Sequence, residues 1–478
     1  MKKVSVVLCL LLILFTMSCA VNPVTGKRQL ALISESGEIS LGKETDAEIR
    51  QQYGVYDDPA INEYVTRIGM SMVPHTHRPH LTYYFAVLDT PVVNAFAVPG
   101  GYIYVTRGIL AMMNSEAELA VVLGHELGHV NARHSVTKMS QLILVQLGLA
   151  VGGALSETVA KIAGVASIGM QLLFLKFSRD DEREADRLGV QYSRSGGFYP
   201  GEMIDFFSTL QKLGDLSGGH SSLPGFLSTH PLTSERIKNT SAMITEEDKK
   251  LAVNQQPYLN RINNLIFGDD PRQGFVDGNA FYHPGMRFSF SFPESWTVQN
   301  TPAQVILASK DGNAAVVLQA EKSTSDLSEY AEKRAESIQN RQFIKEYRST
   351  INGLNALHQT YDVPQEGSDT LRLSMSHIKK AGYIYSFSAL STRSNFYQYS
   401  NDFDGVTNSF RELSDPAYLN RRPRHLVLII ASGKHTLREI FNQNGVPQDE
   451  DLWTKLAIMN AMELGQIPKT NQLVKIVK

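Results

Sequence analysis

The chain has 478 residues, of which 42% are hydrophobic and 20% are charged. This balance excludes a mainly disordered or collagen-like chain, and a mean hydropathy of -0.17 excludes a polytopic membrane protein. The formal net charge of -2 argues against a nucleic-acid partner, which would require a basic surface. We expect several domains, because one hydrophobic core rarely grows beyond about 300 residues.

The first residues have the pattern of a bacterial export signal. Two lysines precede the apolar run Val4–Phe15, which is shorter than the roughly 20 residues of a membrane span, and Ser18 and Cys19 follow it. A cysteine after a small residue resembles a bacterial lipoprotein cleavage site, with Thr16 in place of the usual leucine. We predict a signal peptide over residues 1–18 and an acyl anchor on Cys19. An ordinary cleaved signal peptide is the alternative.

Residues 19–43 are predicted to be a lipidated tether, because Asn22-Pro23 and Thr25-Gly26 are turn-forming pairs. By resemblance to bacterial sorting rules, Ala20 favours the outer membrane, so we expect a periplasmic lipoprotein of a Gram-negative bacterium. The chain's two cysteines, Cys9 and Cys19, precede the predicted folded body. Neither disulfides nor a cysteine-based metal site is therefore expected there.

The first predicted domain covers residues 44–245. Apolar residues at helical spacing predict two helices up to Met72, and aromatic and β-branched runs predict strands at 81–88, 92–98 and 102–105. A long helix is predicted over 115–137, with Ser115 and Glu118 in the pattern of a capping box. Apolar stretches at 141–154 and 162–175 are too short to span a bilayer and predict a helical hairpin packed on the body, with membrane contact as the alternative.

The rest of the chain is predicted to form two smaller domains. A polar linker over 246–273 precedes an α+β domain with an antiparallel sheet over 274–415, whose role the sequence does not indicate. A second linker, 416–424, leads to residues 425–478, where a helix is predicted at Leu437–Gln443 and a last strand at Val474–Val477. This module is similar to a degenerate LysM-like peptidoglycan-binding repeat, and a packing module is the alternative.

The sequence His125-Glu126-Leu127-Gly128-His129 carries the strongest chemical signal. On a helix the two histidines lie at i and i+4 on one face, so both imidazoles can bind one metal ion while Glu126 lies beside it. A third histidine six residues after His129 would complete one known zinc pattern, but that position is Ser135. His134 would lie on a different side of a continuous helix and is interpreted as structural.

The third ligand is therefore predicted to be a carboxylate on a second helix, within residues 178–189. Glu182 and Asp186 share one face of that helix, so Glu182 can reach the metal and Asp186 can hydrogen-bond a ligating histidine. Glu184 remains the competing candidate for the ligand. The loop histidines His75, His77 and His80 are interpreted as solvated, because no carboxylate or cysteine accompanies them.

Together these motifs resemble the gluzincin metallopeptidases of the HtpX, BepA and CAAX-prenyl-protease type, in which HExxH is followed by ExxxD on a later helix. The resemblance covers roughly residues 40–245 and includes Asn94–Ile103 before the zinc helix and Ser228–Leu232 with Arg236 after it. It implies a mainly helical zincin-type domain with a small sheet. The chain departs from the family in lacking the flanking transmembrane helices of the HtpX type and the helical repeats of the BepA type.

The resemblance also implies roles for individual residues. Glu126 would be the general base, and His230 would lie over the zinc ion, either hydrogen-bonding the oxyanion or occupying the fourth metal position as a plug. His230 or Arg236 would share the oxyanion charge. An extended substrate would pair with the edge strand formed by part of 94–105, which gives the predicted substrate-binding residues Asn94, Ala95, Phe96, Tyr102 and Ile103.

We therefore predict an α+β multidomain zinc endopeptidase with one Zn²⁺ per chain that hydrolyses unfolded or misassembled envelope proteins. Two alternatives stay open: an assembly factor or chaperone for outer-membrane proteins with latent protease activity, and a peptidoglycan-binding adaptor. The predicted partners are polypeptide substrates, the membrane through the lipid anchor, and outer-membrane assembly machinery or peptidoglycan. No nucleic-acid partner is expected.

Overall fold

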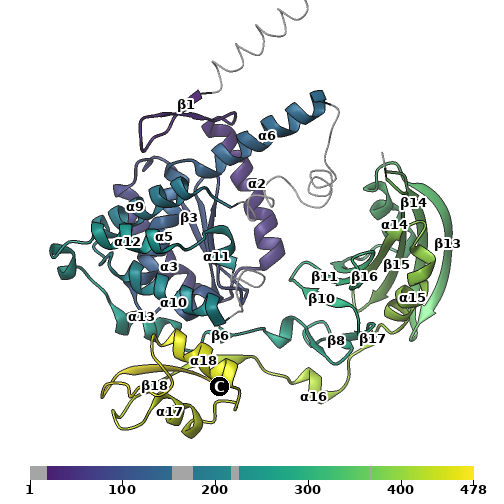
Figure 1. Ribbon diagram of the computed structural model, residues 1–478. Coiled ribbons are helices and arrows are strands. Elements are labelled where there is room, and N and C mark those ends of the chain that lie inside the picture. The colour runs from purple at the N-terminus through teal and green to yellow at the C-terminus, as the bar shows by residue number, and fades with distance from the viewer. Residues whose placement is uncertain (1–18, 153–175, 217–224, 366–367) are drawn as a thin grey trace, which may run out of the picture. The chain divides into compact units, whose positions relative to one another are not determined.

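The computed structural model describes residues 19–152, 176–216, 225–365 and 368–478 (Figure 1). The predicted signal peptide and the second apolar stretch, 162–175, lie outside these residues. The described chain forms two compact units, and the second consists of Gln51–Tyr53 and Asp269–Pro423. The remaining described residues form the first unit. The predicted α+β multidomain class is confirmed.

Unit 1 holds mainly helices. Its helices and strands in chain order are β1 (Cys19–Val21), β2 (Arg28–Leu30), α2 (Glu35–Tyr53, whose last three residues fall in unit 2), α3 (Pro59–Met72), η1 (Val73–His75), β3 (Tyr84–Leu88), β4 (Ala95–Val98), β5 (Tyr102–Thr106), α4 (Arg107–Met112), α5 (Glu116–Asn131), α6 (His134–Gly152), α9 (Arg179–Ser195), α10 (Glu202–Leu216), α11 (Gly225–Thr229), α12 (Ser234–Met243), η3 (Glu247–Lys250), α13 (Gln255–Ile262), β6 (Ile266–Phe267), β18 (Arg424–Ile430), α17 (Leu437–Gln443), α18 (Glu450–Met459) and β19 (Leu473–Val477). Among the described residues, no helix is long and apolar enough to cross a membrane.

A three-stranded sheet in the order β3-β5-β4 lies beside the central helix α5. Strand β5 pairs in parallel with β3 and antiparallel with β4, and the register of the β4 pair places Ala95 opposite Val105 and Val98 opposite Tyr102. All residues of β5 are buried. Strand β4 is therefore an edge of this sheet, and β5 is its centre.

Small residues allow α5 and α9 to pack very closely. A Cβ atom added at Gly124 would lie 3.0 Å from the Gly189 carbonyl oxygen, and one added at Gly128 would lie 3.1 Å from the Cα of Ala185. Every residue of α5 is buried, so this helix runs through the core of unit 1. The close approach brings polar side chains of both helices into one buried space.

The break between α5 and α6 differs from the continuous helix predicted over 115–137. Helix α5 begins as expected, with the Ser115 hydroxyl accepting the Glu118 N–H, but it ends at Asn131. Arg133 then takes a positive φ of 58°, and α6 starts at His134. The Arg133 guanidinium donates to the carboxylate of Glu38 and so stabilises this sharp turn.

The N-terminal part of the predicted tether is folded against the body. The side chain of Ser34 caps α2, which starts at Glu35 rather than after residue 43. Glu38 is fully buried and accepts hydrogen bonds from Arg78 and Arg133. The side chain of Asn22 donates to the Ala132 carbonyl. Hydrogen bonding of this kind holds residues 22–38 on the helix junction, which turn propensity alone does not predict.

The C-terminal residues belong to the same unit as the predicted peptidase domain. Strand β18 pairs with both β19 and β6, so residues 266–267, predicted as linker, are part of this sheet. The core of unit 1 includes Phe441 and Trp453 together with Leu123 and Leu127 of α5. These contacts favour the packing-module alternative for residues 425–478 over a separate LysM-like repeat.

Unit 2 is built around a seven-stranded antiparallel sheet in the order β10-β11-β12-β16-β15-β14-β13. Its elements are η4 (Pro271–Gln273), β7 (Phe275–Asp277), β8 (Ala280–His283), β9 (Phe288–Ser291), β10 (Thr297–Asn300), β11 (Val305–Ala308), β12 (Ala314–Lys322), α14 (Leu327–Glu336), β13 (Gln342–Ile351), β14 (Leu354–Val363), β15 (Leu371–Lys380), β16 (Tyr383–Thr392), η5 (Phe396–Tyr399), α15 (Ser400–Asn408), β17 (Arg411–Glu412) and α16 (Pro416–Leu419). Its core is rich in phenylalanine and contains Trp296. The antiparallel sheet predicted for this region is present, and α14 adds a helix to it.

Candidate metal centre

The two histidines of α5 present their imidazoles on one face, as their spacing predicts. The Nε2 atoms of His125 and His129 are 3.0 Å apart, and each side chain is 1% exposed. Burial lowers the pKa of His129 well below its usual value, so this imidazole is neutral. The neutral His129 imidazole offers a nitrogen lone pair at the point that Nε2 of His125 also faces.

Helix α9 brings the first carboxylates to these imidazoles. The side chain of Ser178 caps the helix in a capping box with Asp181, which places Glu182 in the first turn. A Glu182 oxygen lies 3.6 Å from the Nε2 atom of each histidine of α5. One turn later, Asp186 Oδ1 lies 3.0 Å from Nδ1 of His125. Both acids thus take the positions that their shared helical face predicts.

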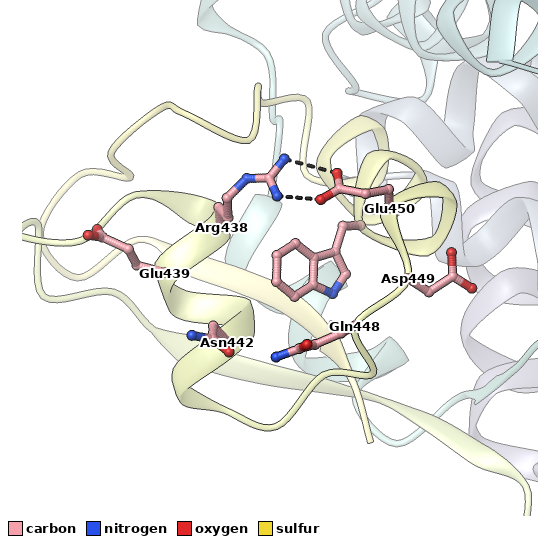
Figure 2. A pocket seen from close by; sticks show the side chains of 7 residues that line it. Arg438, Glu439, Asn442, Gln448, Asp449 and Glu450 are labelled. Atoms are coloured by element: carbon pink, nitrogen blue, oxygen red, sulfur yellow. Dashed lines mark hydrogen bonds and ion pairs between the residues drawn. The ribbon is translucent and has the colours of Figure 1, made fainter.

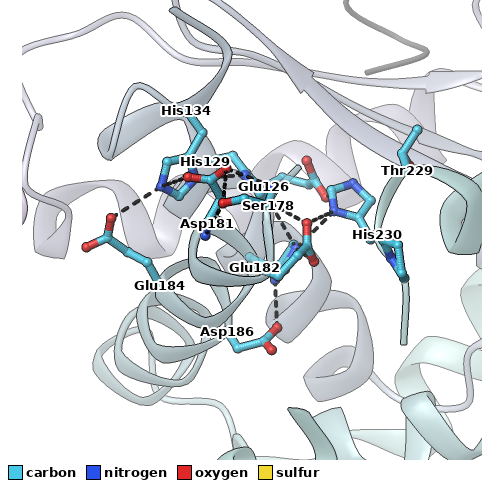
Figure 3. Close-up of polar contacts among 12 residues, drawn as sticks. Glu126, His129, His134, Ser178, Asp181, Glu182, Glu184, Asp186, Thr229 and His230 are labelled. Atoms are coloured by element: carbon cyan, nitrogen blue, oxygen red, sulfur yellow. Dashed lines mark hydrogen bonds and ion pairs between the residues drawn. The ribbon is translucent and has the colours of Figure 1, made fainter. Parts of the chain in front are cut away.

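His230, which directly follows α11, completes the cluster (Figure 3). Its Nδ1 atom lies 2.9 Å from Glu182 Oε1 and 3.4 Å from His125 Nε2. Its ring stacks on Phe226 at 4.7 Å, which fixes the plane of the imidazole. One ligand atom from each of His125, His129, Glu182 and His230 lies within 4.8 Å of the other three.

Arg236 on α12 binds the carboxylates rather than facing open space. Its guanidinium donates two hydrogen bonds of 2.7 Å to Asp186, and its Nη1 atom lies 2.8 Å from Glu182 Oε2. The same group donates to the backbone carbonyls of His230 and Pro231. Because these carboxylates and carbonyls already occupy the guanidinium, the geometry favours a positioning role over the oxyanion role predicted for Arg236.

Glu126 lies beside the cluster and outside it. It is 1% exposed, and its Oε1 atom has no hydrogen-bond partner among the described residues. Burial raises the pKa of Glu126, while His230 and the backbone N–H of Ala97 oppose the shift. A buried carboxylate that has one unpartnered oxygen and holds a proton more readily than usual is suited to accept one from a reacting water.

The residues present fit a bound metal ion. Three imidazoles and one carboxylate converge in a buried space, which is a donor set that transition metals bind. Nitrogen lone pairs 3.0 Å apart repel each other unless a proton or a cation lies between them. Across the described chain, these four residues are the one group of histidine and acidic side chains with such an arrangement.

Several residues considered in the sequence lie outside the cluster. Glu184, the competing ligand, hydrogen-bonds His134 instead, with Oε2 3.2 Å from His134 Nε2. His77 Nδ1 lies 2.6 Å from the Tyr192 hydroxyl, and His80 faces Glu35. The structure therefore gives Glu184 a partner other than the metal cluster.

The open edge of the β3-β5-β4 sheet borders Glu126. Strand β4 holds Ala95 and Phe96, and the N–H of its Ala97 reaches the Glu126 carboxylate. Asn94 precedes this strand, and its buried Oδ1 atom has no hydrogen-bond partner among the described residues. The expectation for Tyr102 and Ile103 needs correction: they lie on β5, whose two edges are already paired, so their backbone cannot pair with an added strand.

Comparison with known proteins identifies the family that part of the chain matches. A profile described as peptidase family M48 matches residues 59–244. The chain carries an M48 peptidase domain. This match confirms the predicted gluzincin-type resemblance, and metalloendopeptidases are among the proteins similar to this chain.

Relatives of the M48 domain occur in bacteria and in plants. The chain is 29% identical to a "Beta-barrel assembly-enhancing protease" of Yersinia pestis over 246 residues, which cover 50% of each protein. It is 33% identical to the "Mitochondrial metalloendopeptidase OMA1" of Arabidopsis thaliana over 42% of this chain and 39% of that protein. The chain thus spans about half the length of these relatives or less.

A solved structure of cyanobacterial PsbP from Synechocystis covers 29% of this chain and 94% of its own chain, with 12% identity and a TM-score of 0.25. This likeness is too low to support a conclusion about fold or function.

Sequence reasoning missed two contacts of the M48 domain. His134 Nδ1 lies 2.9 Å from His129 Nδ1, although a continuous helix would separate these side chains. The positive φ of Arg133 produces the contact, and a single sequence gives little sign of it. The second contact is the N–H of Ala97 on Glu126, which depends on the edge position of β4.

A pocket of about 430 Å³ lies between α17 and α18 (Figure 2). It is lined by Arg438, Glu439, Asn442, Gln448, Asp449, Glu450 and Trp453. Arg438 covers the Trp453 ring at 5.3 Å and binds Glu450 through two hydrogen bonds, while the indole N–H donates to Pro447. The tryptophan face is thus occupied by an arginine, and the pocket does not favour the peptidoglycan-adaptor alternative.

Proposed function

We propose that this chain is a zinc endopeptidase in which His125, His129 and Glu182 hold one Zn²⁺ ion. The observation that carries the proposal is the buried convergence of these three side chains with His230, next to Glu126, whose Oε1 atom has no hydrogen-bond partner among the described residues. Two histidines and a glutamate are the protein ligands of many catalytic zinc sites. Asp186, at 3.0 Å from His125 Nδ1, would orient that ligand.

A bound zinc ion supplies Lewis-acid activation of water and of the scissile carbonyl. Glu126 is the general base, because its free Oε1 atom and raised pKa suit it to accept the proton of the attacking water and pass it to the leaving amine. His230, whose Nε2 atom lies 3.7 Å from Glu126 Oε1, would serve as a fourth ligand and close the site in the resting protein. Its withdrawal would open the position that a substrate carbonyl needs.

The open edge of β4 is the proposed substrate platform. An extended peptide can add a strand there through main-chain hydrogen bonds, and the unpartnered Asn94 Oδ1 atom can accept a peptide N–H. Main-chain pairing depends little on the side chains of the substrate. Unfolded or misassembled polypeptides of varied sequence are therefore the proposed substrates. Ala95 and Phe96 provide the pairing backbone.

The proposed location is the periplasm, with Cys19 acylated and inserted in the outer membrane. The Yersinia relative, by its name, enhances β-barrel assembly, and a related role for this chain in envelope protein quality control is part of the proposal. Cys19→Ser is expected to release the processed protein from membranes. Continued membrane retention of that variant would contradict the lipid anchor.

The decisive experiment measures zinc content and casein hydrolysis together. Glu126→Gln is expected to keep one zinc per chain and to lose hydrolysis by roughly 10²–10⁴-fold, because the ligands stay while the base is removed. Glu235→Gln, an exposed glutamate of α12, is the control and should match wild type. Hydrolysis by pure Glu126→Gln at the wild-type rate would refute the proposed mechanism.

A further inference from the structure

Behind the metal cluster, His134 and Glu184 form a second layer of contacts. The rings of His129 and His134 meet edge to face, with centroids 5.0 Å apart and Nδ1 atoms 2.9 Å apart. His134 is 4% exposed, and its Nε2 atom lies 3.2 Å from Glu184 Oε2 and 3.7 Å from Asp181 Oδ1. A path of contacts therefore runs from the Glu184 carboxylate through the His134 imidazole to the His129 imidazole (Figure 3).

Hydrogen-bond chemistry constrains where the protons lie in these contacts. An ionised carboxylate only accepts hydrogen bonds, so the short contact with Glu184 requires an N–H at Nε2 of His134. The arrangement in which Nδ1 of His134 accepts places an N–H at Nδ1 of His129 across the 2.9 Å contact. The Nε2 atom of His129, which faces the metal cluster, is left with a free lone pair.

We propose that His134 and Glu184 are positioning residues that hold His129 in the tautomer and orientation needed to bind metal through Nε2. This inference rests on the proposed zinc site. It gives His129 the counterpart of the contact that Asp186 makes with His125 at 3.0 Å. Partners of this kind typically contribute 10- to 100-fold to metal affinity.

The position of His134 depends on the break between α5 and α6. Arg133, with its positive φ, turns the chain so that the first residue of α6 faces the last turn of α5. The ring of Phe177 stacks on His129 at 4.1 Å and lies 6.2 Å from His134, which limits rotation of both imidazoles. The fold thus positions His134 against His129 before any metal binds.

The test measures zinc affinity of the full chain by competition with a chelator. His134→Leu removes the acceptor and should weaken zinc binding roughly 10- to 100-fold. His134→Asn places an amide oxygen near the former Nδ1 position and should restore most of the affinity. His77→Leu is the matched control, because His77 contacts Tyr192 rather than the cluster, and it should bind zinc as wild type does.

A second readout uses the metal-free protein. Nitrogen-15 spectra of the histidine rings should show His129 protonated at Nδ1 in wild type and His134→Asn, and a mixture of tautomers in His134→Leu. If His134→Leu fails to fold, Glu184→Leu provides the same comparison, with a similar tautomer mixture and a smaller loss of affinity.

Two outcomes separate this inference from the proposed function. In the first, wild type and His134→Leu bind one zinc ion equally tightly and His129 keeps the same tautomer. This result would overturn the positioning role of His134 and leave the peptidase proposal intact. Wild type that binds no zinc would overturn the peptidase proposal. In that case the ring spectra of the metal-free protein would still decide whether His134 sets the His129 tautomer.

Discussion

Unit 1 and unit 2 both bury histidines, but they surround them differently. In unit 1, His125, His129 and His230 converge on one another and on Glu182. In unit 2, His358 lies between the hydroxyls of Ser349 and Ser376, and the Nδ1 atom of His377 bonds to Ser386. Serine hydroxyls hydrogen-bond these imidazoles without bringing other ligands around them. Burial alone therefore does not mark a metal site, whereas convergence with a carboxylate does.

The most severe test of this contrast removes one histidine from each unit. His125→Ala should lose stoichiometric zinc and reduce casein hydrolysis to background, at or below the level of Glu126→Gln. His377→Ala should keep one zinc per chain and normal hydrolysis, because its partners are hydroxyl groups. Zinc analysis of both purified proteins checks the prediction. Full zinc content in His125→Ala would mean that convergence does not identify the ligands.

Replacing Arg236 tests whether the carboxylates of Asp186 and Glu182 need a cation to hold them in place. Arg236→Gln should weaken zinc binding roughly 10- to 100-fold, because Asp186 and Glu182 lose the cation that orients them. It should also destabilise the protein by about 3–5 kcal/mol, since two buried carboxylates lose the cation that pairs with both of them. Chelator competition and thermal unfolding measure the two effects. A variant with wild-type affinity that loses only hydrolysis would instead support the oxyanion role.

His230 sharpens the comparison because it is a converging histidine outside the α5 and α9 helices. If it closes the resting site, His230→Ala should raise casein hydrolysis roughly tenfold, the factor expected from losing about 1.4 kcal/mol of contact with Glu182. Self-cleavage should rise with it. A fall of roughly 10²–10³-fold would show that His230 instead stabilises the oxyanion. An unchanged rate with unchanged zinc would exclude both roles.

The cluster was more predictable from the sequence than its surroundings. Local spacing determines that His125 and His129 share a face and that Glu182 and Asp186 share another, so these residues could be paired without a structure. The close packing of α5 against α9 depends on Gly124 and Gly189, and this contact is visible only in the folded structure.

The less predictable features depend on long-range contacts. Lys475 of β19 is fully buried and donates to the carbonyls of Ala111 and Met113, so the C-terminal strand joins unit 1 across most of the chain length. Burial lowers the pKa of Lys475, and the nearby Glu118 carboxylate opposes the shift. Strand and helix periodicity located β19 and α17 correctly but carries no information about what they pack on.

The smallest expected effect concerns pH and the histidines of unit 2. Burial lowers the pKa of His377 from 6.5 to about 4. Between these values the unfolded chain binds a proton that the folded chain does not, so unit 2 should lose stability as pH falls. From pH 7 to pH 5 the loss attributable to His377 is about 2 kcal/mol.

A variant that keeps the hydrogen bond isolates this titration. His377→Asn can still pair with Ser386 and should remove about 2 kcal/mol of the pH dependence, while His358 and His283 titrate in both proteins. Trp296 lies in the core of unit 2, so in a Trp453→Phe background its fluorescence follows urea unfolding of this unit alone. Equal pH dependence with and without His377 would mean that this buried imidazole is protonated as easily as a solvated one. The contrast between hydroxyl-bonded and converging histidines would then rest on the metal cluster alone.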